Sequence, residues 1–90
     1  MGAITFTTKD KRFESAVITA SSPNIGLHIE FENPKNNEIV IYRSATGDNF
    51  AAAATIPFSE KVFDTTLVGA VSGLQIKITT KNAPSNGQYI

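Results

Sequence analysis

The only histidine of this 90-residue chain shares one side of a short alternating segment with two carboxylates. His28, Glu30 and Glu32 alternate with apolar residues. In an extended strand such side chains lie on one face, about 6.6 Å apart at each step, and histidine with two carboxylates is an acceptable set of metal ligands. Side chains in one row stand parallel and do not converge on an ion. We therefore expect a solvated outer face and no metal site.

Other chemistry lacks the residues that it needs. A serine or threonine nucleophile requires a neighbouring base, and no Gly-x-Ser-x-Gly elbow accompanies His28. Paired acids for glycoside hydrolysis require a cleft, for which a domain of this size has little room. Thr46-Gly47-Asp48-Asn49 could offer oxygen ligands to calcium, but alone these residue types are typical of a turn. The sequence predicts a non-enzymatic protein with no catalytic residues and no cofactor.

Charge and composition exclude several classes of partner. Eight basic and eight acidic residues cancel, whereas nucleic-acid binding usually needs a basic excess, so we expect no nucleic acid. There is no cysteine for disulfides or thiolate zinc sites. No segment approaches the ~20 apolar residues of a membrane span, and the N-terminus lacks the apolar segment of a signal peptide. We expect no membrane partner and synthesis in the cytoplasm, with secretion left open if a signal has been removed.

Hydrophobic periodicity predicts an all-β chain. Ile25, Leu27, Ile29 and Phe31 alternate with polar residues or glycine, and Leu74–Ile78 repeats that pattern, as expected of strands with one buried face. Ile39–Tyr42 is continuously apolar, which suits a central strand. Turn residues recur at the spacing of a sandwich. The length fits a single domain over residues 1–90.

The segment from Asp48 to Pro57 allows two interpretations. It could be a short helix capped by Asp48 and stopped at Pro57. It could instead be a strand over residues 48–56, with alternate residues on one face. The neighbouring segments are strands and connections are short, which favours the strand.

Three segments resemble fibronectin type III and related immunoglobulin-like domains: Ile41-Tyr-Arg-Ser-Ala-Thr-Gly-Asp-Asn-Phe50, Val62-Phe-Asp-Thr-Thr66 and Gly73-Leu-Gln-Ile-Lys-Ile78. The resemblance implies an antiparallel immunoglobulin-like β-sandwich of about seven short strands. The chain departs from the family in having no tryptophan for the core. Leu74 or Ile76 also stands where the family's corner tyrosine would fall.

The end of the chain bears on function. Asn82–Gly87 has the composition of a turn, which leaves only Gln88, Tyr89 and Ile90 for a closing strand. A full strand needs about five or six residues. We expect the last strand either to be short and dock on its own domain, or to be completed by a neighbouring molecule.

Two hypotheses for function follow. Immunoglobulin-like folds are common in bacteriophage virions, so the resemblance implies a structural assembly protein, such as a capsid decoration, connector or tail component assembled in the host cytoplasm. It would self-associate, or bind other virion proteins, through edge strands and termini. The alternative is an immunoglobulin-like binding module that recognises carbohydrate or another protein. The predicted interface residues are Tyr42, Phe58, Gln88, Tyr89 and Ile90.

Overall fold

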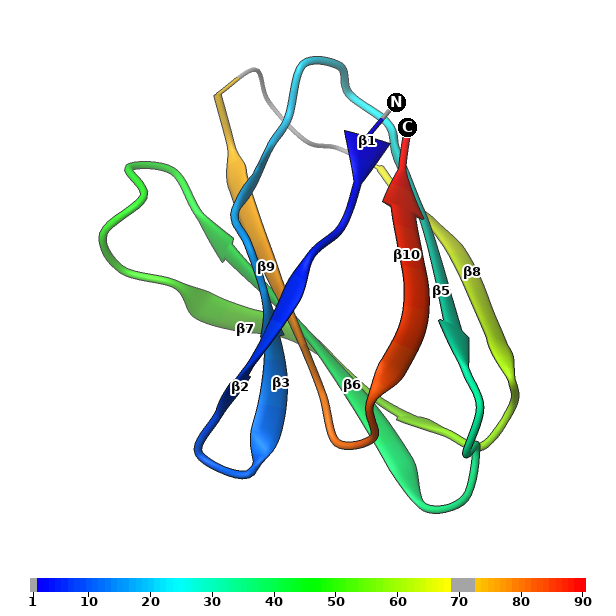
Figure 1. Cartoon of the computed structure of the whole chain (residues 1–90). Coiled ribbons are helices and arrows are strands. Elements are labelled where there is room, and N and C mark those ends of the chain that lie inside the picture. The colour runs from blue at the N-terminus through cyan, green and yellow to red at the C-terminus, as the bar shows by residue number, and fades with distance from the viewer. Residues whose placement is uncertain (1, 69–72) are drawn as a thin grey trace.

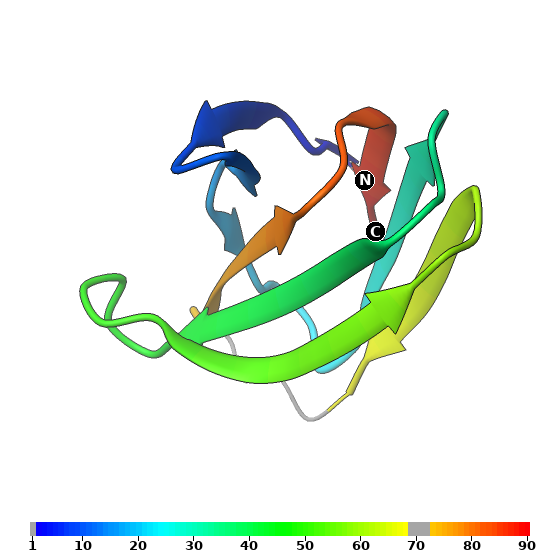
Figure 2. The same cartoon turned by 90° about the horizontal axis from the view of Figure 1, so that it is seen from below.

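The computed structural model describes residues 2–68 and 73–90. These residues form antiparallel strands and no helix, in two sheets consistent with a β-sandwich (Figures 1 and 2), so the all-β prediction is confirmed. The described residues contain ten strands rather than about seven, because breaks divide β1 from β2 and β3 from β4. The strands are β1 (Gly2–Ala3), β2 (Phe6–Lys9), β3 (Arg12–Ser15), β4 (Ile18–Thr19), β5 (Ile25–Phe31), β6 (Asn37–Ser44), β7 (Ala51–Phe58), β8 (Val62–Leu67), β9 (Gln75–Thr80) and β10 (Pro84–Tyr89).

The chain passes repeatedly between the two sheets. One sheet has the order β1-β10-β5-β8, and the other has the order β2-β3-β9-β6-β7, with β4 also paired to β9. The connections from β5 to β6, β7 to β8 and β9 to β10 all cross from one sheet to the other (Figure 1). The edges of the two sheets are therefore β1 and β8, and β2 and β7.

The core consists mainly of isoleucine side chains that point inward from both sheets. Strand β5 alternates between buried and half-buried residues along its whole length, as its sequence pattern predicts. Ile29 from β5 is 0% exposed, as are Ile39 from β6 and Ile76 from β9. β-Branched side chains pack well on a pleated surface because they are stiff at χ1. Strand β6 lies between β7 and β9, which confirms the central position predicted for Ile39–Tyr42.

The ambiguous segment forms a strand. Residues 51–58 make up β7, so the strand interpretation is confirmed and the helix is wrong. Ala54, Ile56 and Phe58 pack against the core, while the residues between them are exposed. Pro57 lies within the strand and does not stop it, because an edge strand tolerates a residue without an N–H on its open side.

The prediction of a turn at Asn82–Gly87 is wrong from Pro84 onward, since only Asn82 and Ala83 of that segment lie in the connection before β10. Strand β10 begins at Pro84, spans six residues and pairs with β1 on one side and β5 on the other. Ile90 extends this pairing, since its N–H donates to Gly26 O at 2.9 Å. Proline is acceptable as the first residue of a strand, and a bulge between Pro84 and Asn86 accommodates the next residues. The last strand is thus complete and internal to its sheet.

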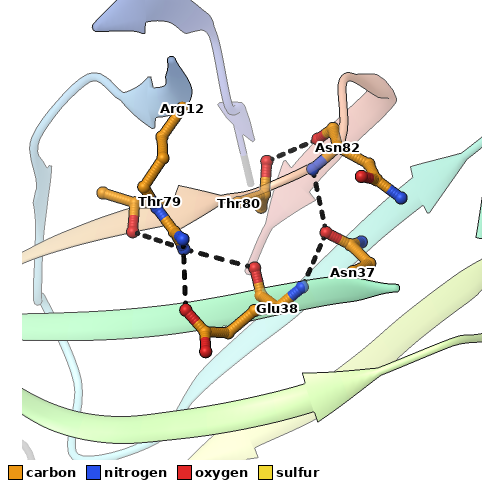
Figure 3. A network of polar contacts seen from close by, with 6 residues as sticks. All are labelled: Arg12, Asn37, Glu38, Thr79, Thr80 and Asn82. Atoms are coloured by element: carbon orange, nitrogen blue, oxygen red, sulfur yellow. Dashed lines mark hydrogen bonds and ion pairs between the residues drawn. The ribbon is translucent and has the colours of Figure 1, made fainter. Parts of the chain in front are cut away.

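A polar network joins two of the connections that cross between the sheets (Figure 3). Asn37 Oδ1 accepts hydrogen bonds from Glu38 N at 2.9 Å and from Asn82 N at 3.0 Å. Asn82 Nδ2 in turn donates to the carbonyls of Asn33 and Lys35, both at 2.8 Å. The turn after β9 is thereby tied to the turn before β6. Asn37 is 4% exposed, and losing its side-chain acceptor would leave the partly buried N–H groups of Glu38 and Asn82 unsatisfied.

The chain between β1 and β2 passes so close to Gly87 that a side chain there would contact it more tightly than is usual. Ile4 N donates to Gly87 O at 2.8 Å, and a Cβ on Gly87 would lie 3.1 Å from Ile4 Cβ and 3.1 Å from Phe6 Cε1. We expect Gly87→Ala to lower the free energy of unfolding by about 1–3 kcal/mol, the usual range for overpacking. Urea denaturation measures this change. Gly26→Ala is the matched control, because its Cβ would meet Ile90 Cβ at an ordinary 3.8 Å; equal effects of the two substitutions would contradict the close approach.

Candidate functional site

The outer face of the four-stranded sheet carries a hydrogen-bonded cluster around His28. Its Nδ1 lies 2.6 Å from Asp64 Oδ1 on β8, and its Nε2 lies 2.8 Å from Glu30 Oε2 on β5. Asn86 Nδ2 on β10 donates to the same Glu30 oxygen at 3.2 Å. The imidazole thereby connects β5 to β8, and Glu30 connects β5 to β10. The register explains the contact, since His28 stands opposite Asp64 in the β5–β8 ladder.

This arrangement favours the charged imidazolium. The hydrogen bonds to Glu30 and Asp64 raise the pKa of His28 above its ordinary 6.5. The hydrogen bond from His28 is the main cause that lowers the pKa of Glu30 below its ordinary 4.5, and the hydrogen bond from Asn86 lowers this pKa further. Only the protonated ring can donate from both nitrogens at once, so the geometry and the pKa shift agree.

The cluster is built for hydrogen bonding and not for holding a metal. Both His28 nitrogens face carboxylates, and among residues 2–68 and 73–90 no group of three histidine, cysteine or acidic side chains could hold a metal ion. Glu32 lies beyond the end of β5 and takes no part. The sequence pattern placed His28 and Glu30 on one face correctly. It missed Asp64 and Asn86, because their strands pair with β5 from distant parts of the chain.

We expect the His28 cluster to make stability depend on pH. Because folding raises its pKa, His28 stabilises the fold fully below pH 6.5, and this contribution is lost as the pH rises through the folded-state value. The contribution of Glu30 to stability is fully present above pH 4.5 and is lost as the pH falls through the lowered pKa of Glu30 in the folded state. Thermal melts from about pH 5 to about pH 8 should show the histidine effect in the wild type and not in His28→Gln. Identical pH profiles for the two proteins would contradict the role of the cluster.

A second candidate site is a hollow of about 300 Å³ on the outer face of the six-stranded sheet. The β2–β3 hairpin borders it on one side and the connection between β6 and β7 on the other. Tyr42 and Phe50 supply aromatic surface, and six polar or charged side chains complete the lining: Lys9, Asp10, Arg12, Glu14, Lys77 and Thr79. The hairpin turns tightly at its tip, where Asp10 and Lys11 take φ values of 52° and 64°.

The charges in this hollow are loosely paired. Glu14 lies 3.7 Å from Lys9 Nζ and 3.5 Å from Lys77 Nζ, longer than the usual hydrogen-bond range. Lys77 Nζ also lies 4.8 Å from the centroid of the Phe50 ring, a cation–π contact. Arg12 reaches across to Glu38 Oε1 at 3.1 Å and to Thr79 Oγ1 at 3.3 Å (Figure 3). The ammonium groups therefore keep donors that a bound molecule could use.

The loop considered for calcium forms a turn that bonds to itself. Ser44 Oγ accepts from Gly47 N at 2.8 Å and from Thr46 N at 3.3 Å, and Thr46 Oγ1 accepts from Asp48 N at 3.4 Å. Gly47 has a φ of 88°, the left-handed conformation that glycine adopts readily. The loop thus uses its hydroxyl oxygens as turn acceptors.

The predicted interface residues are scattered over the molecule. Tyr42 lines the hollow on the six-stranded sheet. Phe58 packs in an aromatic cluster, with ring centroids 6.2 Å from Phe31 and 5.1 Å from Phe63. Tyr89 packs against the core, whereas Gln88 is exposed and Ile90 is 76% exposed. Of the predicted interface residues, only Gln88, Tyr89 and Ile90 lie next to one another.

The sheet edges differ in how well they are protected against pairing with another chain. Strand β1 has two residues, β2 carries Lys9 and β8 carries Asp64; shortness and charge both discourage edge pairing. Strand β7 is different. It has eight residues and no charged side chain, and among the described strands it pairs only with β6. By length and lack of charge this edge is the most open of the four, although Pro57 and a bulge between Ala54 and Ala52 protect it in part. The sequence pattern did not identify it.

No family model, curated protein or solved structure matches this chain. Within the part of the chain that the structure describes, no helix is long and apolar enough to cross a membrane.

Proposed function

We propose that this chain is a non-enzymatic assembly module that self-associates through the open edge of β7. The observation that carries the proposal is the eight-residue edge strand without a charged side chain. Such an edge is a template for an added strand. A second copy is the occupant that we propose, because the formal net charge of zero gives copies little mutual repulsion.

Backbone direction in β7 supports this proposal. Glu38 O accepts from Lys81 N at 3.0 Å, so the backbone of Glu38 faces β9, away from β7. Pro57 and Thr55, which stand opposite Glu38 and Val40, therefore direct their backbone groups to the open edge. Thr55 offers both an N–H and a C=O there, whereas Pro57 has no N–H to donate. Outward pairing at Thr55 is thus limited on one side by Pro57 and interrupted on the other by the register shift between Ala54 and Ala52.

We further propose that the sandwich has an immunoglobulin-like arrangement with exchanged terminal strands. Strands β5 to β9 pair as strands B, C, C′, E and F of that fold do: β5 with β8, and β6 with both β9 and β7. The C-terminal β10 then lies beside β5, in the place of strand A, and β3 lies beside β9, in the place of strand G. In this arrangement β7 and β8 remain as open edges.

A virion component is the biological context that we propose for the assembly. The support is the sequence resemblance at Ile41–Phe50, Val62–Thr66 and Gly73–Ile78, together with the suitability of edge pairing for building arrays of one chain. In that setting the partners are copies of this chain or other virion proteins. Contacts of Gln88 and Ile90 with a partner remain a prediction. They no longer depend on a neighbouring molecule that completes the last strand.

Thr55→Pro tests the β7 edge without disturbing the β6–β7 ladder. It removes an N–H that faces the open side, as Pro57 already lacks one two residues later. In a two-fold dimer the loss counts twice, so we expect the dissociation constant to rise about tenfold or more. Sedimentation velocity over a series of protein concentrations measures this dissociation constant.

Thr55→Val is the matched control, because it keeps the N–H and the β-branched shape. We expect it to associate as the wild type does. Circular dichroism melts check that both variants fold. Equal association of the proline and valine variants, or a wild type that stays monomeric at the highest soluble concentration, would overturn the proposal.

A further inference from the structure

We infer that the hollow on the outer face of the six-stranded sheet binds a neutral saccharide ring. Binding here does not require pairing through the β7 edge. Its volume of about 300 Å³ lies at the lower end of the range for small-molecule pockets, roughly 300–1,000 Å³. One ring of a glycan, free or attached to a larger carrier, is a ligand of suitable size.

The aromatic part of the lining suits the apolar face of a sugar. Tyr42 and Phe50 are both half-buried, so each packs partly against neighbouring residues while part of its side chain remains accessible. They come from β6 and from the residue just before β7, and they meet in one hollow only after folding. Aromatic side chains contribute large contact area at low conformational cost, and Tyr adds a hydroxyl at its tip.

The polar part of the lining suits hydroxyl groups rather than a charge. The hollow holds three cationic side chains and two carboxylates, so it offers donors and acceptors together. The distances from Glu14 to Lys9 and Lys77, 3.7 and 3.5 Å, leave those ion pairs loose. A hydroxyl accepts from an ammonium and donates to a carboxylate at the same time, so a sugar can bridge such a pair without unbalancing its charges.

Charged ligands fit less well. An anion such as phosphate would approach Lys9 and Lys77 but also the Glu14 carboxylate between them, and a cation would meet three positive groups. Either would have to break the existing ion pairs. A neutral ring with several hydroxyls avoids both costs.

Titration of the ¹⁵N-labelled full chain tests this inference by NMR. The probes are glucose, galactose, mannose and N-acetylglucosamine, with glucuronate and inorganic phosphate as charged comparisons. We expect at least one neutral sugar to bind in the millimolar range, with saturable shifts at the amides of Lys77, Thr79 and Tyr42. Saturable binding of phosphate or glucuronate alone, shifts confined to other surfaces, or no saturation by any sugar would overturn it.

Phe50→Ala provides the second arm of the test. Phe50 precedes β7 and lies outside the core cluster, so its truncation removes aromatic surface from the hollow with little risk to folding. We expect it to weaken sugar binding about fivefold to tenfold. Val62→Ala, which changes a 46% exposed side chain on β8 of the other sheet, is the control and should bind as the wild type does. Equal affinity of all three proteins would also contradict the inference.

Discussion

The pairing of β10 with both β1 and β5 determines which sides of this sandwich are closed. Ile90 and Gly26 exchange two backbone hydrogen bonds, of 2.9 and 3.1 Å, and Ile4 N donates to Gly87 O at 2.8 Å. These contacts seal the side of the molecule where the two ends of the described chain meet (Figure 1). On the opposite side the sheets end at β7 and β8, as they end at β1 and β2 on this side. The proposal for self-association depends on the difference between these edges, since β7 is the longest of the four and carries no charged side chain.

The isoleucine core fixes the register on which both outer surfaces depend. Ile29 and Ile78 are 0% exposed, and each is followed by an outward residue that belongs to a surface described above: Glu30 and Thr79. A slip of one residue would turn every side chain of a strand to the other face and bury the charged groups. The positions of His28, Glu14 and Lys77 are therefore consequences of core packing.

The sequence predicted the strands whose burial follows directly from the order of apolar and polar residues along the chain. The alternation at Ile25–Phe31 and the continuous apolar run at Ile39–Tyr42 both predict burial, and both predictions are confirmed. The turn prediction is wrong for Pro84–Gly87 because Pro, Asn and Gly favour turns in isolation, whereas here a bulge and the passage of Ile4 over Gly87 make them suitable for a strand. The partner of His28, Asp64, lies 36 residues away. Contacts of that kind depend on strand order, which no local pattern encodes, and the hollow beside Tyr42 and the open edge at β7 escaped prediction for the same reason.

Amide hydrogen exchange at two neighbouring residues of β7 tests the central claim most directly. Thr55 N–H faces the open edge, whereas Ile56 N–H faces β6, so the two report on pairing outside and inside the molecule. If copies pair through this edge, exchange at Thr55 slows as the protein concentration rises, while Ile56 is protected throughout. Fast exchange at Thr55 at every concentration, in a sample where the chain associates, would place the interface elsewhere and contradict the proposal.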